Sequence, residues 1–198
     1  MQAATALDHW KGEFGNEYTG RQVDNLDARG SAWCKLLPHA LDSILEVGCN
    51  VGRNLDVISG IDGYGFPNKL FGCEPNEIAA SQCRWPVSIA TADRLPYPAA
   101  SMDLVFTCGV LIHIPPDKLE QSMREIHRVS KRWIICGEYF APQEEEITYR
   151  GQKGLMWRRD YGSLYMDLFP DLKCTKTLFA WKRTTGLDNL TFWVFEKQ

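Results

Sequence analysis

Two short stretches carry residue types that could bind a small ligand where strands end. In the first, Gly48-Cys49-Asn50-Val51-Gly52, two glycines flank an asparagine directly after the apolar run 43–47. In the second, Glu74 ends another apolar run, 22 residues after Gly52. An acidic side chain about 20 residues beyond a glycine-rich turn is placed to accept both ribose hydroxyls of an adenosine. The competing interpretations are a turn without a ligand and a solvated carboxylate. The apolar run before Glu74 favours ribose binding.

The spacing of the glycines excludes two kinds of phosphate-binding loop. A dinucleotide fingerprint, GxGxxG, requires glycine at positions 48, 50 and 53, but Asn50 and Arg53 occupy two of them. The chain also lacks the GxxxxGKS or GxxxxGKT pattern of a P-loop. Asparagine adopts positive φ more readily than most residues, so Asn50 permits a tight turn and its side chain would face the ligand. We therefore expect a pocket for an adenosine without phosphates.

A layered α/β scaffold is needed to bring these stretches together. Apolar runs predict strands, and amphipathic stretches between them predict helices. The expected strands are 43–47, 70–74, 87–90, 102–108, 133–139, 174–181 and 190–196. The expected helices are 31–37, 52–59, 77–83, 117–129 and 163–168. This alternation predicts a mostly parallel sheet covered on both faces, with a C-terminal antiparallel hairpin formed by the last two strands.

The composition favours a single globular domain and disfavours several classes of partner. The 198 residues carry a net charge of −3, from 22 basic and 25 acidic residues, which gives no general attraction for nucleic acid. No apolar stretch reaches the length of a membrane span, and residues 1–14 lack a signal-peptide pattern. Seven scattered cysteines without a CxxC pair predict reduced thiols in the cytoplasm. The four histidines form no ligand cluster with them, so we expect no metal.

The order and spacing of these motifs resemble a known enzyme family. Glu46-x-Gly48-x-x-x-Gly52, Glu74, "ADRLPYP" and "MDLVFTCGVLIHI" are similar to the motif series of class I S-adenosylmethionine-dependent methyltransferases, over residues 40–140. "FGNEYTGR", "EVGCNVGRNL", "CGVLIHIPPDKL", "RVSKRWIICGEYF" and "YRGQKG…RRDY" resemble the methylases associated with pseudaminic acid biosynthesis, over nearly the whole chain. The resemblance implies a Rossmann-like three-layer fold, S-adenosylmethionine as cofactor and S-adenosylhomocysteine as product.

The resemblance also implies a role for each residue that matches a motif. The turn around the cofactor would be formed by Glu46, Gly48, Cys49, Asn50 and Gly52, with Glu46 supporting it. Glu74 would bind the ribose hydroxyls, and Pro75 would pack near the adenine. Cys108, Gly109 and Val110 would line the methionine and the sulfonium. Relatives often place an acid near the adenine amino group; here Thr91 and the Ala92 amide hold that register, and Asp93 is the alternative.

We expect residues 1–198 to form one domain with two segments at the cofactor site. Residues 1–40 would form a cap over the cofactor, in which Tyr18 and Arg21 would hold the methionine carboxylate. The alternative for this segment is a flexible tail. Residues 141–160 lack a strand period and would form an insertion on the acceptor side. The oligomeric state is not predicted.

Three residues beyond the fourth and fifth strands are candidates for catalysis. Methyl transfer from a sulfonium depends mainly on positioning and desolvation, and a base is needed only for an acceptor that is protonated at rest. His113 is the candidate base because its ordinary pKa is near neutrality, and a helix-capping histidine is the alternative. Glu138 and Tyr139 end the fifth strand. We expect Glu138 to face the acceptor and Tyr139 to pack, with the reverse as the alternative.

The insertion carries a group of side chains that could bind the acceptor. They are Tyr149, Arg150, Lys153, Trp157, Arg158 and Arg159. Arginine binds carboxylate or phosphate in a bidentate manner, so these residues predict a small anionic acceptor such as an acidic sugar. A solvated loop balanced by residues 144–146 is the alternative, and Trp157 would either stack on a ring or anchor the loop.

Three functional classes are compatible with this sequence. The first is a small-molecule methyltransferase. The second is a methyltransferase acting on RNA or protein, which would require a basic groove or an added recognition domain. The third is a binding module that retains the cofactor without catalysis. The negative charge, the short chain and the tetrapeptide "TCGV", in place of a DPPY- or NPPF-like motif after the fourth strand, favour the first.

Overall fold

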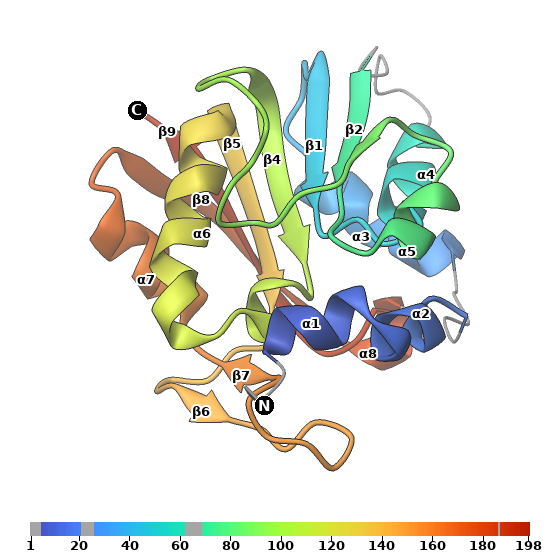
Figure 1. Cartoon of the computed structure of the whole chain (residues 1–198). Helices are drawn as coiled ribbons and strands as arrows, with labels where there is room; N and C mark the ends of the chain where they lie inside the picture. The colour runs from blue at the N-terminus through green and yellow to red at the C-terminus, as the bar shows by residue number, and fades with distance from the viewer. Residues whose placement is uncertain (1–4, 21–25, 62–68, 186) are drawn as a thin grey trace.

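The computed structural model describes residues 5–20, 26–61, 69–185 and 187–198. Within these residues, seven strands form one sheet in the order β3-β2-β1-β4-β5-β9-β8 (Figure 1). The strands are β1 (Ser43–Val47), β2 (Lys69–Cys73), β3 (Val87–Ser88), β4 (Met102–Cys108), β5 (Ser130–Glu138), β8 (Leu172–Ala180) and β9 (Leu190–Lys197). The sequence predicted β1 and β4 with identical bounds, whereas β3 is shorter than expected.

The strands of this sheet are parallel except β9, which lies between β5 and the edge strand β8. β1 pairs in parallel with β2 and β4, and β4 pairs in parallel with β5. β9 is antiparallel to both β5 and β8, which makes β8 an edge strand. The mostly parallel sheet with a C-terminal antiparallel hairpin is therefore confirmed. Because β1, β2, β4 and β5 run in the same direction, the loops that follow them meet at one edge.

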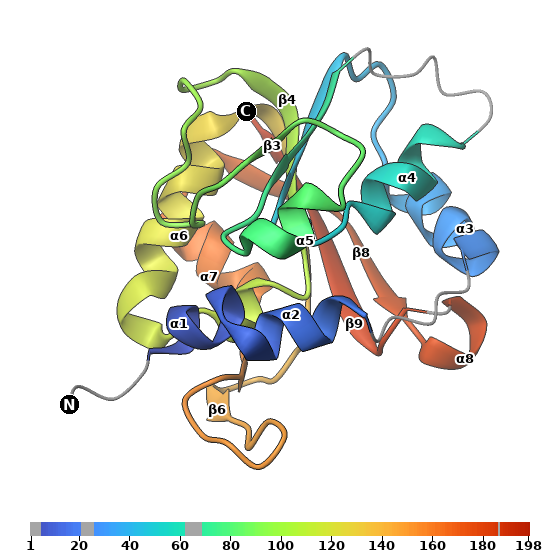
Figure 2. The same ribbon diagram turned by 45° about the vertical axis from the view of Figure 1, so that its right-hand side comes forward.

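Helices cover both faces of the sheet, as Figures 1 and 2 show. α6 (Pro116–Val129) and α7 (Tyr161–Leu168) lie on one face. α3 (Leu26–Leu36) and α4 (Arg53–Ser59) lie on the other. α3 begins five residues earlier than the sequence suggested, and its buried Trp33 packs edge-on against Phe106 of β4. The three-layer arrangement follows from the apolar faces of both the helices and the sheet.

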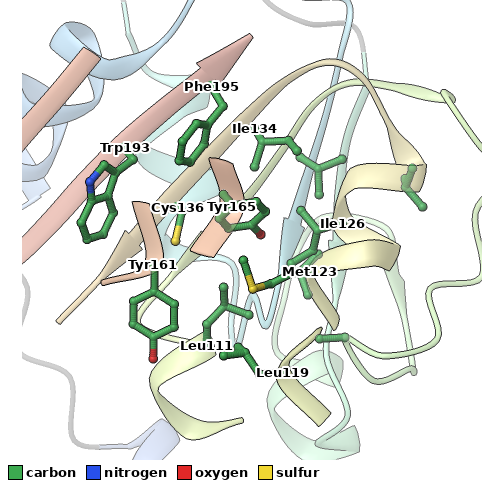
Figure 3. Close-up of a cluster of buried hydrophobic side chains, with 14 of the residues drawn as sticks. Leu111, Leu119, Met123, Ile126, Ile134, Cys136, Tyr161, Tyr165, Trp193 and Phe195 are labelled. Carbon is green, nitrogen blue, oxygen red and sulfur yellow. The ribbon is translucent and has the colours of Figure 1, made fainter. Parts of the chain in front are cut away.

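The core on the α6 side shows how the helical period positions this layer. Leu119, Met123 and Ile126 recur at intervals of four and three residues and therefore share one face of α6. In Figure 3 they belong to one buried cluster with the strand residue Ile134, and Leu119 lies beside Leu111. Pro116 at the first turn suits the start of α6, because its missing N–H would have no helical partner there. This packing fixes the segment between β4 and α6.

Two short helices and a small hairpin lie beyond the carboxyl ends of the parallel strands (Figure 1). α1 (Ala6–Lys11) and α2 (Glu13–Thr19) form the cap, and β6 (Glu145–Glu146) pairs with β7 (Trp157–Arg158) in the insertion. The remaining elements are α5 (Glu77–Ser81), the 3-10 turn η1 (Leu111–His113) and α8 (Lys182–Thr185). Residues 1–40 were expected to cover the cofactor. Of the described residues in that range, 5–20 lie beyond the strand ends, whereas α3 packs against the face of the sheet. No helix in the described ranges is long and apolar enough to cross a membrane.

Contacts with the turn after β2 hold the cap in place. The side-chain amide of Asn76 donates to the carbonyl oxygen of Trp10 at 2.9 Å and to Oδ1 of Asn16 at 2.8 Å. Oδ1 of Asn76 in turn accepts the amide of Ala79 and caps the start of α5. One buried asparagine therefore joins both cap helices to the edge of the sheet where the candidate ligand residues lie.

Candidate active site

A cavity of about 920 Å³ lies between the carboxyl ends of the strands, the cap and the insertion. Its size falls in the upper part of the range typical of small-molecule sites, roughly 300–1,000 Å³. Both stretches that the sequence singled out line it, from Glu46 to Val51 and from Glu74 to Asn76. In the described parts of the chain, no three histidine, cysteine, aspartate or glutamate side chains are grouped to hold a metal ion.

The turn after β1 depends on three residues with positive φ. The φ angles are 72° at Gly48, 49° at Asn50 and 80° at Gly52. A Cβ at Gly48 would lie 2.6 Å from a methyl carbon of Val110, so this position needs glycine for space as well as for conformation. The left-handed backbone predicted for Asn50 is confirmed. Its Oδ1, however, accepts the amide of Val51 at 2.8 Å, so the side chain supports its own turn.

Glu74 connects this turn to the end of β2. Its Oε2 accepts the backbone amide of Asn50 at 2.9 Å, and its Oε1 accepts the amide of Asn76 at 2.9 Å. The residue is 7 % exposed and lines the cavity. Burial raises the pKa of the carboxyl, and the two amide hydrogen bonds oppose that rise. Each carboxylate oxygen keeps a further lone pair, so Glu74 can accept two more hydrogen bonds from a ligand.

Glu46 lies deeper in the cavity wall and is almost completely buried. Its Oε1 accepts the side-chain amide of Asn54 at 2.7 Å, whereas its Oε2 has no hydrogen-bond partner among the described residues. Burial raises the pKa of this carboxyl to about 8, and the Asn54 bond and the charge of Arg29 oppose the rise. Arg29 donates to Oδ1 of Asn54 at 3.1 Å and also lines the cavity.

The segment after β3 forms the wall next to Glu74. Thr91, Ala92 and Asp93 all line the cavity, as does Pro75. The hydroxyl of Thr91 donates to Oδ1 of Asp93 at 2.6 Å, so the two residues considered for an adenine contact are joined. Oδ2 of Asp93 lies 3.9 Å from the ammonium of Lys118. Thr91 and Asp93, the two candidates for the adenine contact, therefore both lie on this wall of the cavity.

Glu138, the last residue of β5, and Tyr139, which follows it, have the reverse of the expected orientations. Tyr139 lines the cavity, whereas Glu138 is fully buried and points beneath η1. The Glu138 carboxylate accepts the amides of Val110, Leu111 and Ile112 at 3.2, 3.1 and 3.3 Å. The prediction that Glu138 faces the acceptor is wrong. Alternation along the strand separates neighbouring side chains, and the buried carboxylate lies where three amides can satisfy it.

The end of β4 forms the floor of the cavity. Cys108, Gly109 and Val110 all line it, and Gly109 has a φ of 72°. Burial raises the pKa of the Cys108 thiol to about 12, so the thiol is uncharged at neutral pH. All seven cysteines are free thiols. The floor therefore consists of small, uncharged residues at the position where the sequence predicts the methionine part of the cofactor.

His113 lines the cavity with its proton position fixed. Its Nδ1 lies 2.7 Å from the carbonyl oxygen of Leu155. A carbonyl can only accept, so Nδ1 must carry the hydrogen and Nε2 carries the lone pair. Burial lowers the pKa of the ring to about 4, which keeps it neutral near pH 7. The ring lies between those of Trp10 and Tyr149, with centroids at 4.4 and 5.3 Å.

The insertion contributes fewer cations to the cavity than the sequence suggested. Tyr149, Arg150 and Trp157 line it, as predicted. Lys153 and Arg158 are exposed and are not among its lining residues. Arg159 is 1 % exposed and pairs with Glu144 at 2.6 Å. A substrate-binding role for Arg159 is therefore incorrect, because its guanidinium is used inside the protein.

The cap supplies one predicted and one unpredicted residue. Tyr18 lines the cavity, whereas Arg21 lies outside the described residues. Trp10 was not singled out, although it lines the cavity and its ring centroid lies 4.4 Å from that of His113, with the rings tilted by 54°. Arg29 and Asp188 also line the cavity and were missed, since no local motif marks either. Asp188 interacts with the hydroxyl of Tyr139 and forms an ion pair with Lys182 at 2.8 Å.

Comparison with known proteins agrees with this fold. Residues 45–133 match a family model described as a methyltransferase domain. This match runs from β1 to β5 and includes the turn around Asn50, Glu74 and His113. The chain thus has the Rossmann-like fold found in S-adenosylmethionine-dependent methyltransferases.

Three solved structures illustrate the likeness. A 1,6-didemethyltoxoflavin-N1-methyltransferase from Burkholderia thailandensis, with bound 1,6-didemethyltoxoflavin and S-adenosylhomocysteine, is 14 % identical with a TM-score of 0.70, covering 100 % of this chain and 92 % of its own. An S-adenosylmethionine-dependent methyltransferase from Thermotoga maritima is 20 % identical with a TM-score of 0.64, covering 93 % and 97 %. The magnesium protoporphyrin IX methyltransferase from Synechocystis, with bound S-adenosylmethionine, is 13 % identical with a TM-score of 0.67, covering 100 % of both chains. At these identities the likeness shows the fold alone.

Proposed function

We propose that this chain transfers a methyl group from S-adenosylmethionine to a small anionic acceptor. The observation that carries the proposal is the buried Glu74 carboxylate, which faces the cavity and is oriented by the amides of Asn50 and Asn76. A carboxylate held beside a glycine-rich turn in this way suits the two hydroxyls of a ribose. The free thiols are compatible with the cytoplasm as the compartment.

The donor groups of the cavity fit the parts of this cofactor. Glu46 Oε2 is a buried acceptor without a partner among the described residues, and it suits the ammonium of the methionine part. Arg29 lines the same region and brings a positive charge suited to the methionine carboxylate. Thr91, Ala92 and Asp93 form the wall for the adenine, next to the ribose site at Glu74.

When bound, the sulfonium compound supplies a methyl group already activated for displacement. The chain would then contribute positioning and exclusion of water, through the cap above and the floor at Cys108–Val110. His113 Nε2 would accept the hydrogen of the acceptor's N–H or O–H, because Nδ1 already donates to Leu155. Burial raises the pKa of the Tyr139 hydroxyl well above its usual range, so Tyr139 would act as a hydrogen-bond donor.

Arg150 supports an anionic acceptor, of which an acidic sugar is our leading example. Its guanidinium lies over the rings of Phe14, Tyr18 and Tyr149, at 5.6, 5.9 and 5.5 Å from their centroids. These rings orient a cation at the cavity wall without neutralising it, so its N–H groups remain available to a carboxylate or phosphate. Of the four cations in the insertion, Arg150 is the one that lines the cavity.

Calorimetric titration with S-adenosylhomocysteine tests cofactor binding. We expect the wild type and Glu77→Ala to bind equally, since Glu77 is exposed on α5. Glu74→Ala should bind about 10- to 100-fold more weakly, because hydrogen bonds to a charged group contribute about 1.5–3 kcal/mol. No binding by the wild type, or equal binding by Glu74→Ala, would contradict the cofactor site.

Incubation with isotopically labelled S-adenosylmethionine and a metabolite extract tests the reaction. The proposal predicts label in a low-mass anionic product. Label in an RNA or protein fraction would instead indicate a macromolecular acceptor. Cofactor binding without any labelled product from either fraction would favour a non-catalytic binding module.

A further inference from the structure

The 3-10 turn η1 is held from two sides by a buried carboxyl group and a buried guanidinium. At its start, the Glu138 carboxylate of β5 accepts the amides of Val110, Leu111 and Ile112. The Arg159 guanidinium of the insertion donates to the carbonyl of Ile114, directly after the turn, at 3.2 Å, and to the carbonyl of Leu111, the first residue of the turn, at 3.3 Å. Glu138 is 0 % exposed and Arg159 is 1 % exposed.

The accepting and donating characters of these two groups match the polarity of the turn. Free amides at the start of a helical turn attract a negative charge, and free carbonyls at its end attract a positive one. A buried charge is strongly destabilising unless hydrogen bonds satisfy it. Arg159 is held further by Oε2 of Glu144, at 2.6 Å, and by the Tyr161 hydroxyl, at 3.1 Å. The two ends of η1 are therefore fixed with respect to β5 and to the insertion.

The residue that this turn carries into the cavity is His113. Its Nδ1 donates to the carbonyl of Leu155, four residues before Arg159 in the same insertion. The insertion thus contacts η1 twice, through the guanidinium of Arg159 and through the Leu155 carbonyl. A displacement of Arg159 would move both contacts together.

We propose that Glu138 and Arg159 are positioning residues that hold η1 so that Nε2 of His113, and not Nδ1, faces the cavity. Neither residue lines the cavity, so both would act through His113. The catalytic consequence rests on the proposed function, whereas the orientation and tautomer of His113 do not. The insertion would then have two roles, since Arg150 contacts the acceptor and Arg159 orients the base.

Nitrogen-15 NMR of the histidine rings, recorded without cofactor at neutral pH, tests this proposal. The His113 signals are assigned by their loss in His113→Asn. We expect the wild type and the exposed neighbour variant Arg158→Met to show one neutral tautomer, with the hydrogen on Nδ1. Arg159→Met should show a mixture of both tautomers, and Arg159→Lys, which can still donate to the carbonyls, should show a smaller change.

A second variant keeps the test decisive if Arg159→Met does not fold. Glu138→Gln preserves the shape of the side chain but presents an amide group to three donors, so it should also mix the tautomers. A purely structural role would lower the stability of these variants and leave the His113 tautomer unchanged. A folded Arg159→Met or Glu138→Gln with the wild-type tautomer would overturn the proposal. Because the spectra contain no cofactor, this result is independent of whether S-adenosylhomocysteine binds.

Discussion

The Glu74 carboxylate accepts the backbone amide of Asn50 at 2.9 Å, and this contact joins the end of β2 to the turn after β1. The register between the two strands makes the contact possible, because Val47 pairs with Cys73 directly before both turns. The same carboxylate accepts the backbone amide of Asn76, and the side chain of Asn76 holds the cap. The proposed ribose site, the glycine-rich turn and the cap are thus linked through one side chain.

The left-handed backbone at Asn50 predicts a defined order of stability for its variants. Asn50→Gly should be close to the wild type, because glycine adopts a φ of 49° without strain. Asn50→Val should lower the free energy of unfolding by about 1–2 kcal/mol relative to Asn50→Gly, since this conformation disfavours side chains branched at Cβ. Urea denaturation measures both. Equal stability of the two variants would contradict the strained turn.

Replacement of His113 should separate catalysis from cofactor binding. His113→Ala is expected to reduce turnover by about 10²-fold, the lower end of the usual contribution of a positioned base, because its lowered pKa makes it a weaker base. Its affinity for S-adenosylhomocysteine should change little. His127→Ala is the matched control, because His127 pairs with Asp171 and is not among the residues that line the cavity. Unchanged turnover in His113→Ala would assign His113 a structural role.

The burial of Glu138 predicts a specific dependence of stability on pH. Burial raises the pKa of this carboxyl from its ordinary 4.5 to about 7. Below pH 4.5 both the folded and unfolded states hold the proton, and between pH 4.5 and 7 only the folded state keeps it. The wild type should therefore lose stability relative to Glu138→Gln as the pH rises through this window, by at most about 3 kcal/mol. Chemical denaturation at several pH values measures the difference, and parallel profiles would disprove the burial effect.

Replacement of Arg150 should weaken binding of the acceptor and leave binding of the cofactor unchanged. In Arg150→Ala the KM for the labelled acceptor is expected to rise by about 10- to 100-fold, from the loss of charge-assisted hydrogen bonds. The dissociation constant for S-adenosylhomocysteine should stay nearly constant. Lys153→Ala, from the same insertion but outside the cavity lining, should change neither quantity. A weaker affinity for S-adenosylhomocysteine with an unchanged KM would place Arg150 at the cofactor.

Local patterns were sufficient to bring the residues of the proposed cofactor site to the cavity. β1 and β4 are apolar runs with clear ends, so their bounds and the turns after them could be predicted. Asn50 is constrained by its own φ angle, and Glu74 follows from the shared direction of the parallel strands. In each case the relevant physics lies within one strand and the turn that follows it.

The acceptor half depends on contacts between distant residues. Period-two alternation separates Glu138 from Tyr139 but does not say which one faces the cavity, since that depends on amides 26 to 28 residues earlier. Arg159 resembles its exposed neighbour Arg158 in sequence, and only the carbonyls of Leu111 and Ile114 explain its burial. Trp10 and Arg29 reach the cavity through packing of the cap and of α3, which no short motif records.

A crystal structure with bound S-adenosylhomocysteine would show directly whether Glu74 binds the ribose. We expect both ribose hydroxyls within hydrogen-bonding distance of the Glu74 carboxylate, with the adenine against Thr91–Asp93 and the sulfur above Cys108–Val110. A ligand bound elsewhere, or a Glu74 side chain turned away from the ribose, would contradict it.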